Sequence, residues 1–239
     1  MTTSMTRRSF LKTAALTVTA MGLPEICRAR ETSKPPNFVI IFLDDSGWAD
    51  FEPFSAPAYR TPHVKQLAAE GCCFRNFHVP QAVCSASRSA LLSGCYPGRT
   101  KVFGAHGPKA RGLDPKYATT GEVLKAAGYS TAVFGKWHIG DQPDTRPWAR
   151  GFDESCGLMY SNDMWEFHPE NPEHWGKYPL QFWDNGKVTI DRVTKKHQPM
   201  LTTWYTEHAV DFINRNKDKP FFLYVAYSVP HYPLDEPEE

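Results

Sequence analysis

The stretch NFVIIFL, residues 37–43, is a continuous apolar run rich in β-branched residues, and it ends directly in Asp44-Asp45. A run of this kind and length predicts a buried central strand, because the strands of parallel sheets are covered by helices on both faces. Residues 221–228 (FFLYVAYS) form a second such run, and residues 129–134 predict a third strand. Strands that alternate with helical segments indicate an α/β fold with a mainly parallel central sheet and helices on both faces.

Helices are predicted between these strands at residues 62–70, 85–93, 120–127 and 206–216. The first begins with Thr61 as its N-cap, and the third begins with a capping box formed by Thr119 and Glu122. Residues 72–79 are compatible with a further strand. Residues 141–200, rich in Trp and Pro and without sustained periodicity, predict long loops and short elements.

Chemically reactive side chains follow the predicted strands repeatedly. Asp44 and Asp45 come after the first strand, Lys136 and His138 after the next, and His231 after the last. In open α/β sheets the ligand lies beyond the carboxyl ends of the strands. The sequence therefore predicts that these polar side chains point toward one crevice.

Charge and composition exclude some functions. The chain has 27 Lys+Arg against 26 Asp+Glu, a formal net charge of +1, and no dense basic run. Binding to nucleic acid is therefore not expected, because such binding depends on clustered positive charge. The hydrophobic fraction of 41% is that of a soluble protein with a sizeable core.

The first 29 residues have the pattern of an export signal. Arg7-Arg8 precede Phe10 and Leu11, and a short, mildly apolar run follows. This pattern resembles a twin-arginine signal peptide, and the run is too short to span a membrane. We therefore expect residues 1–29 to be a signal peptide and 30–239 to be the catalytic domain. The expected partner is the export machinery, the expected location is the periplasm or the extracellular space, and no stable membrane insertion is expected.

Cysteines remain in odd number after that segment: Cys72, Cys73, Cys84, Cys95 and Cys156. An odd count in an exported protein suggests that at least one has a role other than disulfide bonding. Cys84 stands out because it opens the run Cys84-Ser-Ala-Ser-Arg88, which continues to Leu-Ser-Gly94. Taken alone, Cys84 is also compatible with a buried structural cysteine before a helix.

The run from Cys84 to Gly94 resembles the signature of the sulfatase family, Cys-x-Pro/Ala-x-Arg followed by Leu-Thr/Ser-Gly. The resemblance implies the alkaline-phosphatase-like fold and conversion of Cys84 to formylglycine by an installing enzyme, which becomes an expected partner. It further implies hydrolysis of an aryl or carbohydrate sulfate monoester through a covalent sulfo-intermediate on that residue. Arg88, on the same helical face, would supply donors for the sulfate oxygens.

Further residues match the family pattern. Gly135-Lys136-Trp137-His138-Ile139-Gly140 resembles Gly-Lys-Trp-His-Leu-Gly, in which Lys136 would bridge the nucleophile and the sulfate and His138 would accept a proton. His231 matches a histidine that donates to the sulfate or the leaving oxygen. Ser161 matches more weakly a serine that would bind substrate, and a loop serine that caps a turn is the alternative.

A metal site is implied by the same resemblance. Asp44 and Asp45, directly after the first strand, occupy the place where sulfatases hold calcium, and the modified Cys84 would complete their side of the site. Carboxylate oxygens suit Ca²⁺, with Mg²⁺ as the alternative. The family completes this site with an Asp-Asn pair and a second lysine that would lie beyond residue 239. We therefore expect residues 1–239 to be an N-terminal fragment, weakly active or inactive alone, and interpret Asp184-Asn185 as a loop.

Two other functions remain open at this stage. One is a phosphatase or phosphonate-ester hydrolase of the same superfamily, which would commonly use Ser or Thr and two zinc ions. The other is a sulfatase-like domain that binds sulfated ligands without turnover. Several aromatic residues lie between Trp148 and Trp183. They are compatible with stacking on a sugar or aryl ring, but we prefer to interpret them as packing for irregular loops. The expected ligand is a sulfated small molecule or glycan.

Overall fold

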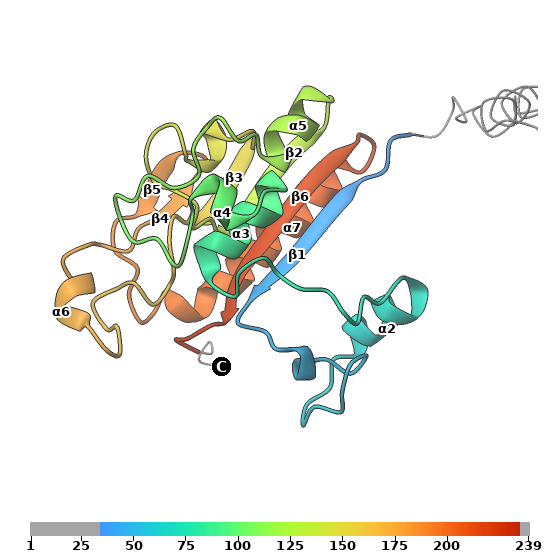
Figure 1. Cartoon of the computed structure of the whole chain (residues 1–239), viewed down its shortest axis with the longest axis horizontal. Helices are drawn as coiled ribbons and strands as arrows, with labels where there is room; N and C mark the ends of the chain where they lie inside the picture. Colours follow the sequence, from blue (N-terminus) through green and yellow to red (C-terminus); the bar gives the residue numbers. More distant parts are fainter. Residues whose placement is uncertain (1–33, 235–239) are drawn as a thin grey trace, which may run out of the picture. The chain divides into compact units, whose positions relative to one another are not determined.

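The computed structural model describes residues 34–234, which contain one six-stranded sheet in the order β1-β6-β2-β3-β4-β5 (Figure 1). The strands are β1 Phe38–Asp44, β2 Ser130–Lys136, β3 Glu154–Leu158, β4 Phe182–Asp184, β5 Lys187–Ile190 and β6 Phe221–Pro230. Strands β1, β6, β2 and β3 are mutually parallel, whereas β4 and β5 are antiparallel additions. The carboxyl ends of these four strands therefore lie at the same end of the sheet; β1, β2 and β6 were predicted from the sequence, whereas β3 was not.

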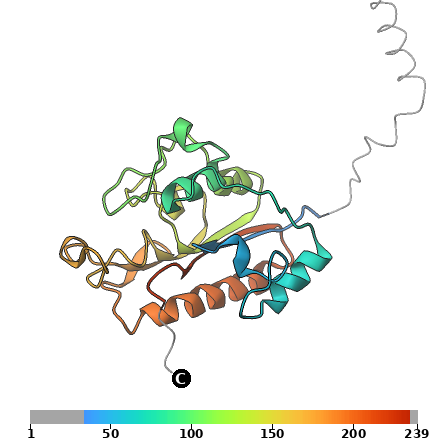
Figure 2. The same cartoon turned by 60° about the horizontal axis from the view of Figure 1, so that its bottom comes forward.

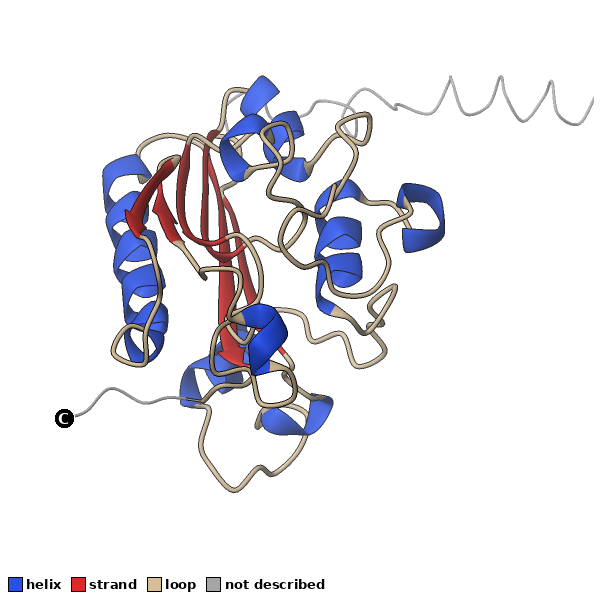
Figure 3. Cartoon of the chain, turned by 90° about the vertical axis from the view of Figure 1, so that its left-hand side faces the viewer, coloured by secondary structure: helices blue, strands red, loops and turns tan. Residues whose placement is uncertain are grey.

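Helices cover both faces of this sheet. The helices of the described residues are α2 Pro62–Glu70, α3 Cys84–Ser93, α4 Pro97–Thr100, α5 Thr120–Ala126, α6 Pro172–Trp175 and α7 Leu201–Asn216, with short 3-10 helices at Trp48–Asp50, Pro147–Ala149 and Gln198–Met200; α2 and α6 have no buried residues. Figure 2 shows α7 on one face and α3 and α5 on the other, and Figure 3 shows the same layers edge-on. The predicted α/β fold with helices on both faces of a mainly parallel sheet is confirmed. The sheet is mixed, because β4 and β5 add two antiparallel pairings to the parallel strands.

Alternating side chains of β2 and β6 supply the two halves of the core. Phe134 and Leu223 pack with Phe212 of α7 on one face. Val133 and Phe222 pack with Leu92 of α3 on the other. Such alternation is forced by the two-residue period of a strand, and it explains why β6 must be apolar along its whole length. The prediction of a buried strand at residues 221–228 is confirmed.

The prediction of a buried central strand at residues 37–43 is wrong for the residues that the structure describes. β1 pairs only with β6 and lies at the edge of the sheet. Phe38, Val39 and Ile41 are 42%, 46% and 60% exposed. The apolar content of a strand reflects what its side chains contact, so it does not distinguish an edge strand from a central one. Among the described residues, no strand pairs with the second side of β1.

Two local predictions also fail. Residues 72–79 form turns and irregular backbone without strand pairing. Thr61 makes no capping hydrogen bond to α2, because its hydroxyl accepts instead from the backbone N–H of Glu52, at 3.0 Å. α2 itself forms where predicted, but Leu67 is 63% exposed and lines a cavity with Val64 rather than packing in the core.

Other boundaries match closely. α3 ends at Gly94, whose φ of 64° is the left-handed conformation that favours glycine. α5 begins with the predicted capping box, in which the Thr119 hydroxyl and the Glu122 backbone N–H meet at 3.1 Å. The predicted signal peptide at residues 1–29 lies outside the described residues. Within the described part of the chain, no helix is long and apolar enough to cross a membrane.

Candidate active site

Cys84 is the first residue of α3, and its half-buried side chain lines a cavity of about 620 Å³. Asp44, Asp45 and Arg88 line the same cavity. Val83, which precedes the helix, has an extended backbone, and α3 then runs from Cys84 to Ser93 with Gly94 as its C-cap. The end of β1 and the first turn of α3 therefore bring the predicted metal residues and the predicted nucleophile to one cavity.

Arg88 lies one turn further along α3 and is fully buried. Its guanidinium donates to the backbone carbonyl of Lys136 at 2.7 Å and to the Tyr224 hydroxyl at 3.3 Å. It also contacts the Asp44 carboxylate at 3.2 Å and the Tyr227 carbonyl at 3.3 Å. The two terminal nitrogens of Arg88 are thus engaged with the protein, which fixes its positive charge in place, whereas its Nε atom is buried without a hydrogen-bond partner among the described residues.

Lys136, the last residue of β2, is fully buried and joins the same group. Its Nζ atom donates to the Asp44 carboxylate and, at 2.8 Å, to the Ser161 hydroxyl. Ser161 follows β3 and is also buried. The structure therefore places Asp44, Arg88, Lys136 and Ser161 in direct contact, although they come from three strand ends and one helix.

These charges determine the protonation of their neighbours. Burial alone would raise the pKa of Asp44, but Lys136 and Arg88 outweigh it and hold that pKa below its ordinary value. For Cys84, burial is the largest effect and Asp44 adds to it, so the pKa of the thiol is raised although Lys136 and Arg88 oppose the shift. Unmodified Cys84 is therefore a neutral thiol at neutral pH.

His138 is buried just beyond β2 and has a φ of 58°, an uncommon backbone conformation for a residue with a side chain. Its Nε2 atom lies 2.7 Å from the carbonyl oxygen of His106 and must carry a proton to make that hydrogen bond. Its Nδ1 atom is buried without a hydrogen-bond partner among the described residues. Burial, followed by the charges of Lys136 and Arg88, lowers the pKa of His138 well below its ordinary value, so the ring is a neutral acceptor at Nδ1.

The lowered pKa of His138 makes a prediction about stability. In the unfolded state His138 takes up a proton as the pH falls below about 6.5, whereas in the folded state it stays neutral. The contribution of His138 to the unfolding free energy is therefore fully present above that pH and is lost progressively below it. Because of this one group, we expect the unfolding free energy of the full-length protein to be smaller at pH 5.5 than at pH 7.5, by on the order of 1 kcal/mol. Urea unfolding at the two pH values measures the difference.

His138→Gln should remove this part of the pH dependence, and His63→Gln, at an exposed position on α2, should leave it unchanged. An equally steep dependence in His138→Gln would contradict the assignment.

His231 and Asp45 form a second contact at the same edge of the sheet. The His231 Nε2 atom lies 3.6 Å from the Asp45 carboxylate, whose side chain is 67% exposed. Asp45 has a φ of 64°, so the chain turns sharply after β1. His231 also lowers the pKa of Asp44, but its effect is smaller than those of Lys136 and Arg88.

Asp44 and Asp45 are the residues that would hold the implied calcium ion. Their hard carboxylate oxygens at the rim of a cavity fit such an ion. Among the described residues, no group of three or more His, Cys, Asp or Glu side chains is close enough to form a metal site by itself. Neither Asp184 nor Asn185 lines this cavity, and the Asn185 side chain accepts from the Ser155 backbone N–H at 3.0 Å in the turn between β4 and β5.

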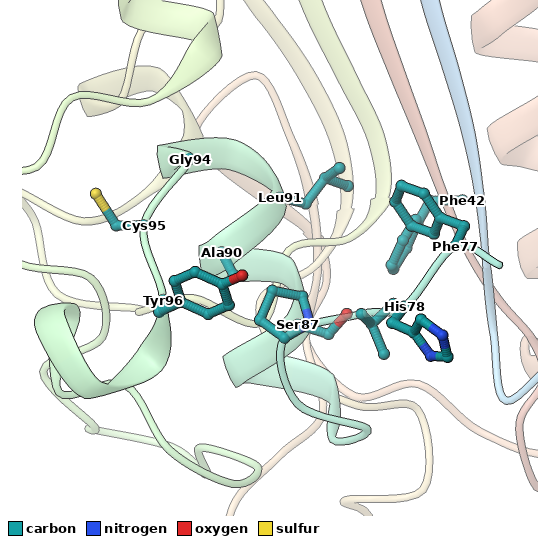
Figure 4. A pocket seen from close by; sticks show the side chains of 11 residues that line it. Phe42, Phe77, His78, Ser87, Ala90, Leu91, Gly94, Cys95 and Tyr96 are labelled. Carbon is teal, nitrogen blue, oxygen red and sulfur yellow. The ribbon is translucent and has the colours of Figure 1, made fainter. Parts of the chain in front are cut away.

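A smaller cavity of about 290 Å³ adjoins the first and shares Phe42, Phe77, Val79 and Ser87 with it. Figure 4 shows Ser87 and Leu91 of α3 across this cavity from Phe42 and Phe77. Most of its lining residues are apolar, as are most of those that line the larger cavity together with Cys84. The aromatic residues of the 148–183 segment pack against each other, as in the Trp148–Trp183 contact at 5.7 Å, which supports the packing interpretation.

Three residues near the site were not expected from the sequence. Tyr224 contacts Arg88 from within β6, and Ser85 and His106 connect α3 with His138. Position 224 on the inner face of an apolar strand could have indicated Tyr224, because a buried hydroxyl needs a partner. His106 lies in an irregular loop and had no sequence signal. All five cysteines of the described residues are free.

The site thus brings two buried cations, a carboxylate and a cysteine at the start of a helix to the carboxyl ends of the parallel strands. The chain belongs to the sulfatase family, since the family model described as Sulfatase matches residues 36–239. The resemblance inferred from the motifs is thereby confirmed.

Curated relatives have the same assignment. Human arylsulfatase A is 36% identical over 220 residues, which cover 84% of this chain and 42% of that protein. Pig N-acetylgalactosamine-6-sulfatase is 31% identical over 220 residues, which cover 84% of this chain and 41% of the relative. The chain thus spans about two fifths of the length of these relatives.

Solved structures support the fold. The PsFucS1 sulfatase from Pseudoalteromonas sp. superposes with a TM-score of 0.74 at 24% identity, covering 97% of this chain and 50% of that one. A second structure, BT4656 in complex with its substrate D-glucosamine-2-N,6-O-disulfate, has a TM-score of 0.61 at 26% identity, covering 83% of this chain and 35% of that one.

Proposed function

We propose that the full-length protein hydrolyses a sulfate monoester to an alcohol and sulfate, with formylglycine made from Cys84 as the nucleophile and with a bound calcium ion. The observation that carries this proposal is the contact of Asp44 with Arg88 and Lys136 beside Cys84. Two fixed cations in a water-poor site stabilise the negative charge of a bound sulfate and of its transition state.

The protonation of Cys84 favours a modified nucleophile. A reactive cysteine is normally a thiolate with a lowered pKa, whereas the pKa of the Cys84 thiol is raised. When present, formylglycine supplies a hydrate with two oxygens on one carbon, so that one oxygen can attack sulfur and the other can drive release. This chemistry does not need a thiolate, which agrees with the surroundings of Cys84.

The remaining side chains have complementary proposed roles. Lys136 holds the sulfate and the nucleophile, and Ser161, which receives a hydrogen bond from Lys136, fixes that amine and contacts substrate. Arg88 acts through its charge and by holding Asp44 and the end of β2. His138 accepts a proton at Nδ1, and His231 donates to the leaving oxygen. Asp44 and Asp45 would hold calcium, whose charge would withdraw electron density from sulfate oxygens.

The proposed substrate class is an aryl or carbohydrate sulfate. Relatives named as an arylsulfatase and as an N-acetylgalactosamine-6-sulfatase, and the disulfated glucosamine bound by BT4656, support this range. The larger cavity, which Cys84 lines among mainly apolar residues, is compatible with either type of leaving group.

The test uses the full-length protein produced together with a formylglycine-installing enzyme. Peptide mass spectrometry over residue 84 should show an aldehyde in place of the thiol. Assays of 4-nitrophenyl sulfate and 4-nitrophenyl phosphate in parallel should show calcium-dependent turnover of the sulfate ester and at least about a hundredfold preference for it. A plain cysteine with full activity, or a preference for phosphate, would sink the proposal.

A further inference from the structure

Three hydrogen bonds hold the loop of residues 104–107, two to the first turn of α3 and one to Gln81 just before the helix. The backbone N–H of His106 donates to the Ser85 hydroxyl at 2.9 Å. The backbone N–H of Ala86 donates to the Gly104 carbonyl at 3.2 Å, and the Gly104 N–H donates to the Gln81 side chain at 3.3 Å. Ser85 is fully buried, so its hydroxyl is fixed by packing and has this loop as its recorded partner.

The same loop determines which nitrogen of His138 carries the proton. The carbonyl of His106, on the residue whose N–H binds Ser85, accepts from His138 Nε2 at 2.7 Å. Nδ1 is left as the lone-pair atom, buried and without a partner among the described residues. A histidine that acts as a base needs its second nitrogen held in this way, because that bond fixes both the tautomer and the ring orientation.

We propose that Ser85 is a positioning residue for His138, acting through the backbone of His106. The chain of contacts runs from the residue after the nucleophile, through one hydroxyl and one peptide unit, to the proposed base. The hydrogen bond of Ser85 thus connects α3, which carries residue 84, with the loop that orients His138. It thereby fixes the position of the nucleophile relative to the base. This assignment rests on the proposed function.

The affected step is the release of sulfate. In that step His138 Nδ1 takes the proton of the free hydroxyl on the side chain of residue 84, and the O–H electron pair forms the new C=O bond. The bond from that carbon to the sulfate oxygen breaks, and its electron pair leaves on the sulfate. Attack on sulfur precedes this step, so a displaced His138 should slow release more than attack.

Three variants of the full-length protein test the assignment, with rates expressed per aldehyde found at residue 84. Ser85→Ala removes the hydroxyl, and Ser85→Thr retains it. Ser89→Ala is the matched control, since Ser89 is equally buried on α3 but bonds only to the Ala86 carbonyl, at 3.2 Å. We expect Ser85→Ala to lower kcat by roughly ten- to a hundredfold, a loss typical of a misplaced catalytic group.

The decisive measurement is the mass of the enzyme during turnover of 4-nitrophenyl sulfate. Ser85→Ala should accumulate protein heavier by one sulfuryl group at residue 84, whereas the wild type, Ser85→Thr and Ser89→Ala should not. Equal turnover in Ser85→Ala and the wild type, an equal loss in Ser89→Ala, or slow turnover without retained sulfate would overturn the assignment while leaving the proposed function intact. A wild type without aldehyde and without turnover would instead overturn the proposed function and this assignment with it.

Discussion

Cys84→Ala in the full-length protein is expected to reduce sulfate-ester hydrolysis by at least about a thousandfold, because it removes the only proposed covalent nucleophile. The substitution should leave the fold intact, since the Cys84 side chain is half-buried at the rim of a cavity and makes no recorded side-chain hydrogen bond among the described residues. Initial rates with 4-nitrophenyl sulfate measure the loss, and circular dichroism verifies the fold.

Cys84→Ser distinguishes a missing nucleophile from a missing release step. A serine hydroxyl can attack sulfur once but has no second oxygen with which to expel sulfate, so the variant should retain one sulfuryl group and stop. Cys72→Ala, at an exposed cysteine outside the cavity, should keep wild-type activity. Sustained turnover by Cys84→Ala would show that another residue performs the chemistry.

The sequence predicted the fold best where local signals and burial agree. β6 is apolar along its length because both of its faces are covered, and α5 has a complete capping box, so both elements were found with nearly correct bounds. β3 escaped individual prediction because Glu154–Leu158 is short and contains Gly157, which lies against the Gly135 backbone of β2. β1 was predicted to be a central strand because its sequence is hydrophobic. Whether a strand lies at the edge of a sheet depends on its pairing, which the sequence of the strand alone does not show.

For the site, the sequence indicated residues whose chemistry is unusual at the end of a strand. Asp44, Lys136 and His138 were proposed for that reason, and the motif around Cys84 added Arg88. It did not indicate what each side chain contacts. The Arg88 guanidinium binds Asp44 and backbone carbonyls, and the His138 tautomer depends on the carbonyl of His106. Every residue has a backbone carbonyl, so the residue type does not show which carbonyl will accept a hydrogen bond. Positioning of this kind cannot be inferred from a pattern of side chains.

The two adjacent aspartates should separate stability from activity. Asp44→Asn removes the carboxylate charge that balances Lys136 and Arg88, both fully buried. Leaving buried cations uncompensated costs about 3–5 kcal/mol, so we expect the unfolding free energy to fall by that amount and activity to be lost. Asp45→Asn changes a side chain that is 67% exposed, so it should hardly alter stability.

Activity should nevertheless be strongly reduced in both variants if both carboxylates hold calcium. Urea unfolding, together with calcium titrations of the initial rate, measures the two properties separately. We expect Asp45→Asn to need at least about tenfold more calcium for half-maximal rate, since loss of one charged ligand weakens a calcium site. An Asp45→Asn variant with wild-type calcium dependence would remove Asp45 from the metal site. An Asp44→Asn variant as stable as the wild type would contradict the electrostatic basis of the site, because the contacts of Asp44 with Lys136 and Arg88 would then contribute nothing to stability.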